Sequence, residues 1–127
     1  MKLEAWQSTG NAVFLLKNHF VWLTKYRKPV LIPPIDKRIQ ELLQQLCEAV
    51  GIEVLRSEVM PDHVHLFVCA KPALSPAGIM QDLCGKLAYI LFREFPDLRK
   101  QLWGSSLWNP GYYVGTAGEV SAQTIIR

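Results

Sequence analysis

The order of apolar and polar residues along the chain predicts alternating strands and helices. Residues 12–24 are apolar, rich in aromatic and branched side chains, and free of Gly and Pro, which is typical of a long strand. Prolines at 29, 33 and 34 then interrupt the chain. From Ile35 to Val50 the apolar residues recur at helical spacing, and Gly51 follows where a helix commonly ends.

The second half of the chain continues this alternation. Residues 52–60 and 63–70 predict two strands, which the turn at Pro61-Asp62 would join into a hairpin. Ser75-Pro76 predicts the start of a helix that runs to about Phe95, where Pro96 stops it. After a looser stretch, residues 112–116 predict a short strand. Ser121 would then cap a last helix, which is cut off at Arg127.

The predicted order is βαββαβ, the ferredoxin-like or RRM-like pattern. It indicates a single α+β domain over residues 1–127, lacking the end of the C-terminal helix. We expect an antiparallel sheet with helices on one face, so that the other face is free for a ligand. This fold hosts many functions, so the chemistry must come from particular residues.

Composition narrows the class of protein. Half of the 127 residues are hydrophobic and a fifth are charged, as in one compact globular domain. No apolar run reaches the roughly 18 residues of a membrane span, and the N-terminus lacks the features of a signal peptide. We therefore expect a cytoplasmic protein with no membrane partner. Three widely spaced cysteines without a CxxC motif predict reduced core thiols at Cys47, Cys69 and Cys84.

Positive charge gathers near the N-terminus. The net charge is only +3, but residues 1–30 hold five cations and one anion. The segment Lys25-Tyr26-Arg27-Lys28 sets one ring among three cations, a combination that suits phosphates and unstacked bases. The alternative is a solvated strand end, and spacing alone does not choose between the two.

The most informative short segment is the HxH motif within residues 61–68, PDHVHLFV. Side chains alternate on a strand, so His63 and His65 point to one face while Val64 points into the core. The two imidazoles could share a metal ion, or they could be surface histidines without a partner. Two protein ligands would leave an open site, which phosphate chemistry needs, rather than a closed zinc site. Manganese, magnesium or a late transition metal would suit such ligands.

Four blocks of sequence, in this order, resemble one family. They are HFVW at 19–22 with KYRKPVL at 25–31, VMPDHVH at 59–65, LWNPGY at 107–112, and VGTAG at 114–118. The chain is similar, from about residue 12 to Arg127, to the IS200-like single-tyrosine transposases of the smallest bacterial insertion sequences, which are HUH endonucleases.

The resemblance implies a prokaryotic, nucleoid-associated homodimer that cuts and rejoins hairpin-bearing single-stranded DNA through a phosphotyrosine bond. It implies that His63 and His65 hold a divalent metal, Mg²⁺ or Mn²⁺. Asp62 and His19 are candidates to support this site, although His19 could equally be a buried, hydrogen-bonded histidine. The expected DNA contacts are Lys25, Tyr26, Arg27, Lys28, Trp108 and Tyr112.

The sequence departs from the family pattern at two places. The alignment puts the nucleophilic tyrosine one place beyond Arg127, and a metal-binding glutamine four residues further. Cys84 stands where the family usually has a lysine, and whether the nearby Lys86 replaces it stays open. None of the four tyrosines present matches the position of the nucleophile.

We therefore interpret the sequence as a truncated transposase that does not cleave DNA. The alternative is a non-catalytic DNA-binding module, such as a repressor or an inactive dimer partner. A general metal-dependent hydrolase is disfavoured, because the sequence shows no carboxylate cluster.

Overall fold

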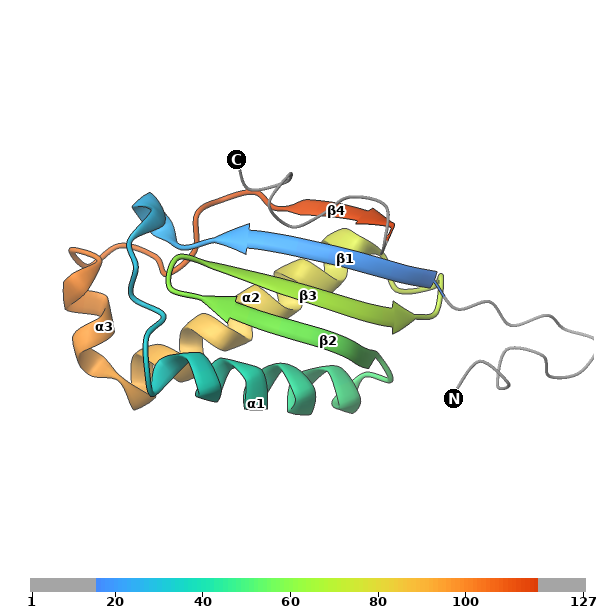
Figure 1. Ribbon diagram of the computed structural model, residues 1–127, viewed down its shortest axis with the longest axis horizontal. Helices are drawn as coiled ribbons and strands as arrows, with labels where there is room; N and C mark the ends of the chain where they lie inside the picture. Colours follow the sequence, from blue (N-terminus) through green and yellow to red (C-terminus); the bar gives the residue numbers. More distant parts are fainter. Residues whose placement is uncertain (1–15, 117–127) are drawn as a thin grey trace, which may run out of the picture.

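A four-stranded antiparallel sheet with helices on one face forms the fold of the computed structural model, which describes residues 16–116 (Figure 1). The elements are β1 (Leu16–Leu23), η2 (Lys25–Arg27), α1 (Ile35–Ala49), β2 (Glu53–Met60), β3 (His63–Ala70), α2 (Pro76–Glu94), α3 (Pro96–Gln101) and β4 (Tyr113–Thr116). The strand order is β2-β3-β1-β4. The α+β prediction is confirmed. Residues 12–15 of the predicted first strand and the predicted last helix lie outside the described residues.

The two long helices begin and end at the predicted signals. Chain direction changes after α1 at Gly51, whose φ of 78° is accessible to glycine at little cost. At the start of α2, the Ser75 hydroxyl oxygen accepts a hydrogen bond from the Gly78 amide at 3.1 Å. No described helix has the length and apolar character required to cross a membrane.

The structure contains a short helix, α3, that the sequence pattern does not predict. Pro96 ends α2, as expected, but it is also the first residue of α3. Proline suits the first turn of a helix because its missing amide hydrogen would have no partner there. Leu98 and Leu102 are buried and fix this segment against the core.

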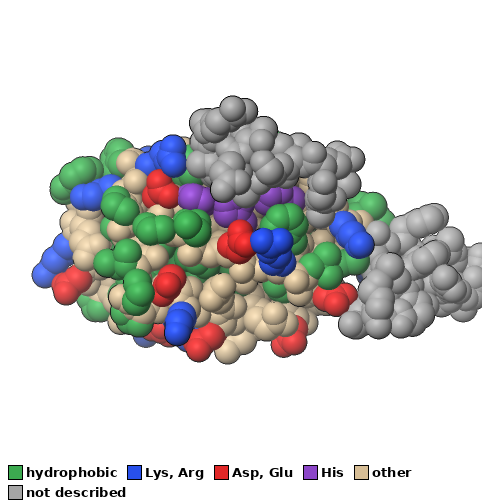
Figure 2. Space-filling model, viewed as in Figure 1, with side chains coloured by type: hydrophobic (Ala, Val, Ile, Leu, Met, Phe, Trp, Pro, Cys, Tyr) green, Lys and Arg blue, Asp and Glu red, His purple; other side chains and the backbone are tan. Residues whose placement is uncertain are grey.

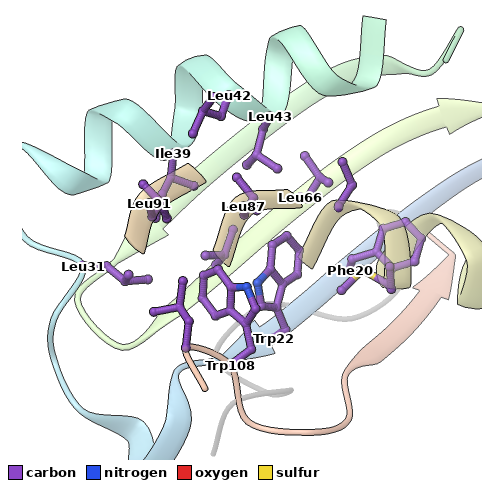
Figure 3. Close-up of a cluster of buried hydrophobic side chains, with 14 of the residues drawn as sticks. Phe20, Trp22, Leu31, Ile39, Leu42, Leu43, Leu66, Leu87, Leu91 and Trp108 are labelled. Atoms are coloured by element: carbon purple, nitrogen blue, oxygen red, sulfur yellow. The ribbon is translucent and has the colours of Figure 1, made fainter. Parts of the chain in front are cut away.

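The core fills the space between the sheet and the helices (Figure 3). Trp22 from β1 and Trp108 from the segment before β4 meet edge to face, with ring centroids 5.9 Å apart. Leu43 from α1 and Leu87 from α2 pack on the same layer. The three cysteines are free thiols: Cys47 and Cys69 are buried and Cys84 is half-buried, in agreement with the prediction.

An irregularity in β2 determines which of its side chains reach each face. The register against β3 shifts between Val54 and Arg56, as in a β-bulge at Leu55. Val54 lies opposite Val68 before the shift, and Glu58 lies opposite His65 after it. The bulge therefore lets Val54 join the core while Glu58 shares the face of the histidines.

Candidate metal and nucleic-acid site

The three histidines of the chain lie together on the sheet face that the helices leave uncovered. His63 and His65 alternate along β3 with Val64 and Leu66, both of which are fully buried in the core. His19 stands on the neighbouring strand β1. In Figure 2 the histidine side chains form a row, bordered by acidic and basic side chains. The prediction that His63 and His65 share a face opposite to Val64 is confirmed.

His63 is held by a chain of charged groups. Its Nδ1 lies 2.7 Å from an Asp62 carboxylate oxygen. The other Asp62 oxygen accepts a hydrogen bond from Arg27 at 3.2 Å. Because an ionised carboxylate only accepts, Nδ1 of His63 must donate, which leaves Nε2 of the neutral ring with its lone pair. Asp62 thus orients His63, as the sequence suggested.

His65 is held by His19. Nδ1 of His65 and Nε2 of His19 are 3.4 Å apart, and the His19 ring stacks on Phe67 with centroids 4.0 Å apart. Only 1% of His19 and 3% of His65 is exposed. A ligand role for Nε2 of His65 requires that its Nδ1 donates and that His19 accepts. His19 is therefore both a buried, hydrogen-bonded histidine and a neighbour of the site.

Electrostatics favour neutral rings at His65 and His19 and an ionised Asp62. Burial lowers the pKa of His65 to about 4, helped by the neighbouring His63 and His19 rings, and burial also lowers the pKa of His19. Burial would raise the pKa of Asp62, but its bonds with His63 and Arg27 outweigh this and bring it below its usual range. Metals bind the neutral form of histidine, and the lowered pKa values keep His65 and His19 in that form.

The donor set fits an open metal site. The rings of His63 and His65 are 4.8 Å apart at their centroids, and both can present Nε2. Within residues 16–116, no three His, Cys, Asp or Glu side chains converge on one point. Two imidazole ligands would leave the remaining coordination positions to water or to phosphate oxygens. Glu58, opposite His65, is bonded to Arg56, which lowers the pKa of its carboxyl group.

The cationic segment at 25–28 forms η2, a tight turn beside this site. Tyr26 and Arg27 have positive φ angles of 60° and 52°. Thr24 is buried and its hydroxyl donates to the Lys28 carbonyl at 2.8 Å, which closes the turn. The Arg27–Asp62 pair ties the turn to the start of β3. Three cations and an exposed ring are thus brought to the edge of the histidine row.

The two tryptophans of the 103–108 segment have opposite placements, and that of Trp108 differs from what we expected. Trp108, predicted to contact DNA, is only 8% exposed, packs on Trp22 and donates its ring N–H to the Cys84 carbonyl. This placement argues against a DNA contact. Trp103, to which the sequence reading assigned no role, is 70% exposed and lies beside Tyr26. Tyr112 is exposed and its predicted DNA contact stays a prediction.

Cys84 and Lys86 belong to the helix side of the molecule. Cys84 is half-buried in α2, and burial raises the pKa of its thiol to about 12. Lys86 pairs with Asp82 at 3.2 Å and lines a cavity of about 430 Å³ between the start of α2 and the end of α1. Since α2 packs on the sheet face opposite to the histidines, Cys84 and Lys86 both lie away from the histidine row, and whether Lys86 replaces the family lysine stays open.

Comparison with known proteins decides the family. The family described as "Transposase IS200 like" matches residues 12–127. The chain belongs to the IS200-like transposase family. It is 37% identical to the ISDra2 transposase TnpA of Deinococcus radiodurans, over 84% of this chain and 76% of that one. It is 31% identical to the transposase for insertion sequence element IS200 of Salmonella typhimurium, over 84% and 70% of the two chains.

Solved structures agree with this IS200-like assignment. A crystal structure assigned to a transposase of Deinococcus radiodurans superposes with a TM-score of 0.81 at 36% identity, covering 94% of this chain and 88% of that one. A REP-associated tyrosine transposase bound to a REP hairpin has a TM-score of 0.58 at 9% identity, covering 90% and 64%. The second likeness shows the shared fold alone.

Proposed function

We propose that this transposase binds hairpin-bearing single-stranded DNA at insertion-sequence ends and holds a divalent metal, Mg²⁺ or Mn²⁺, on His63 and His65. The observation that carries the proposal is the pair of imidazoles on the sheet face opposite to the helices, each with Nδ1 engaged by another side chain. A bound metal would polarise a phosphate oxygen of the strand to be cut. Membership of the IS200-like transposase family supports the choice of DNA as the partner.

The chain's own residues would prepare this reaction in three ways. Asp62 and His19 keep the two ligand rings in the orientation that presents Nε2. The cations of η2 would hold the phosphates of the incoming strand beside the site. Burial of His65 keeps its ring neutral and free of a competing proton.

Strand cleavage also needs a nucleophilic hydroxyl. Of the four tyrosines, Tyr89 bonds Arg93 on α2, and Tyr26 and Tyr112 contact Trp103 and Phe20. Tyr113 is near His19, but its ring lies across Gly115. We propose, from the family resemblance, that the nucleophile is none of these and that its place is just beyond Arg127, in a helix that also carries a glutamine ligand. We also expect a homodimer, which sedimentation velocity would detect.

Titration with Mn²⁺ by calorimetry tests the metal site. The 127-residue chain should bind weakly, and His63→Ala should abolish the signal. Asp62→Asn should weaken binding by about tenfold or more, because the ring it orients is released. Glu41→Gln, on the exposed side of α1, is the matched control and should change nothing. Binding that persists in the His63→Ala, His65→Ala double variant would exclude this site.

A covalent-adduct assay tests the reaction. The 127-residue chain, given Mn²⁺ and a hairpin oligonucleotide, should form no adduct on a denaturing gel, because only water is available as a nucleophile. Appending a Tyr-Ile-x-x-x-Gln helix should produce an adduct that is lost when that tyrosine becomes phenylalanine. An adduct with the 127-residue chain would contradict the proposal, and Tyr113→Phe would then identify its origin. Hairpin binding without any adduct in the extended chain would favour the non-catalytic DNA-binding module.

A further inference from the structure

Two large aromatic rings are exposed side by side at one end of the molecule. Tyr26 of η2 is 56% exposed and Trp103, after α3, is 70% exposed. Their centroids are 5.3 Å apart and their planes are tilted by 56°. Figure 1 shows the turn after β1 and the segment after α3 at the same end of the sheet. The fold thus brings together two rings that are far apart in the sequence.

Each ring has a lysine beside it. The Lys28 ammonium lies 4.1 Å from the centroid of the Trp103 ring, and that of Lys25 lies 5.4 Å from the Tyr26 centroid. Asp62 is already paired with Arg27. Within residues 16–116 neither lysine forms an ion pair, so both ammonium groups can contact an anion that approaches the rings.

The backbone under both rings is strained. Tyr26, Arg27 and Trp103 are the non-glycine residues with positive φ in the 16–116 region, and Trp103 has φ of 56°. This conformation is unfavourable for bulky residues. The turns are nevertheless held: Thr24 closes η2, and the Gly104 amide donates to the Arg99 carbonyl at 2.9 Å. The strained backbone does not bury the rings, because both remain exposed to solvent.

We infer that Tyr26 and Trp103 form a stacking site for one unpaired base of the DNA strand that flanks the hairpin. Lys25 and Lys28 contact the phosphates on either side of that base. This inference rests on the proposed function and adds a subsite to it. A nucleotide brings both a π face and negative charge, which match the rings and the ammonium groups. An apolar protein surface would instead have to desolvate both lysines.

The site is joined to the histidine row through the turn itself. Arg27 lies between Tyr26 and Lys28 in sequence and bonds to Asp62, which orients His63. A base stacked on Tyr26 is therefore held by the same turn that positions the start of β3. The strand next to the hairpin would be fixed at the rings before it reaches His63.

An abasic scan combined with ring variants tests the inference. Fluorescence anisotropy would measure the affinity of the 127-residue chain for a hairpin oligonucleotide with a single-stranded flank, removing one flanking base at a time. For the unaltered protein, one position should lower affinity by about five- to a hundredfold, the range measured for a stacked base. Trp103→Leu should lower the affinity for the intact oligonucleotide by a similar factor. Removing the sensitive base should then lower the affinity of this variant no further, since the two changes remove one contact.

Matched variants distinguish the loss of stacking from a loss of folding and from a change in side-chain size. Trp103→Phe should retain most of the affinity, and Tyr26→Leu should behave as Trp103→Leu does. Tyr89→Leu is the control, because Tyr89 is 63% exposed and also has an arginine beside it, on α2. It should leave binding unchanged.

Four results would overturn the inference. The abasic losses could be equal in the unaltered protein and in Trp103→Leu, which excludes stacking on Trp103. Trp103→Leu could weaken self-association in sedimentation while DNA affinity stays intact, which would make the rings a protein contact. The unaltered chain could fail to bind any hairpin, in which case the proposed function fails first and the subsite with it. Salt-dependent hairpin binding without a sensitive abasic position removes the subsite alone.

Discussion

Side chains are buried on both faces of β1 and β3, but different contacts hold them on each face. Towards the helices, Phe20, Trp22 and Leu66 are buried by apolar packing. Towards the other face, His19 and His65 are buried to a similar degree, but what holds them is a contact between their ring nitrogens and the stacking of His19 on Phe67, its partner on β3. The buried fraction of a side chain in this sheet therefore does not indicate whether it belongs to the core or to the site. The chemistry of the contacts separates the core from the site.

Removing an apolar side chain from the face that packs on the helices should lower the free energy of unfolding far more than removing one from an exposed position. Leu66→Ala should lower the free energy of unfolding by about 2–5 kcal/mol, because it leaves a cavity where no water can replace the lost contacts. Urea denaturation measures this change. Leu55→Ala, at the exposed bulge of β2, is the control and should cost about 0.5 kcal/mol or less. Equal costs at both positions would contradict the division between the faces.

Acid should destabilise the protein through the histidine face. The pKa of His65 is about 4 in the folded protein and about 6.5 when the chain is unfolded, so the unfolded state takes up its proton first. In metal-free protein the free energy of unfolding should hold above pH 6.5 and fall by up to about 3 kcal/mol towards pH 4.

The variant His65→Gln isolates this titration, because glutamine carries no proton to gain. Urea denaturation at several pH values should give a flatter profile for His65→Gln than for the unaltered protein. The His19 ring, whose pKa is lowered as well, would leave a residual slope in the same direction. Identical profiles would show that His65 does not titrate in this range.

The smallest effect concerns the two tryptophans of the core. The ring N–H of Trp22 has no partner among the described residues, whereas that of Trp108 donates to the Cys84 carbonyl. Trp108→Phe should therefore cost about 1 kcal/mol more than Trp22→Phe in urea denaturation, the net value of one hydrogen bond. A larger loss for Trp22→Phe would indicate that its nitrogen has a partner, such as a buried water.

The strands, the two long helices and the faces of β3 could be predicted because each leaves a local pattern. The HxH alternation places His63 and His65 on one face whatever the rest of the fold does. Asp62 adjoins His63 in the sequence and was a candidate for this reason, but the contact of His19 with His65 depends on strand register, which local pattern does not contain.

Other features depend on tertiary context. Pro96 was correctly expected to stop α2, yet the same residue starts α3. The bulge at Leu55 leaves no trace in the alternation of β2, so Glu58 was not recognised as a neighbour of His65. Trp103 and Trp108 stand in one loop with similar neighbours in sequence. Only the packing shows that Trp108 belongs to the core and Trp103 to the surface.

The two-residue connection at Pro61-Asp62 has a genetic consequence. Substituting a codon within β3 changes one side chain, but inserting or deleting a single codon after His63 would move every later residue to the opposite face. His65 would then point at α2, and Val64 or Leu66 would face solvent. We expect this stretch to tolerate conservative substitutions better than a change of length by one residue, so that homologous sequences would keep the spacing between His63 and Ala70 constant.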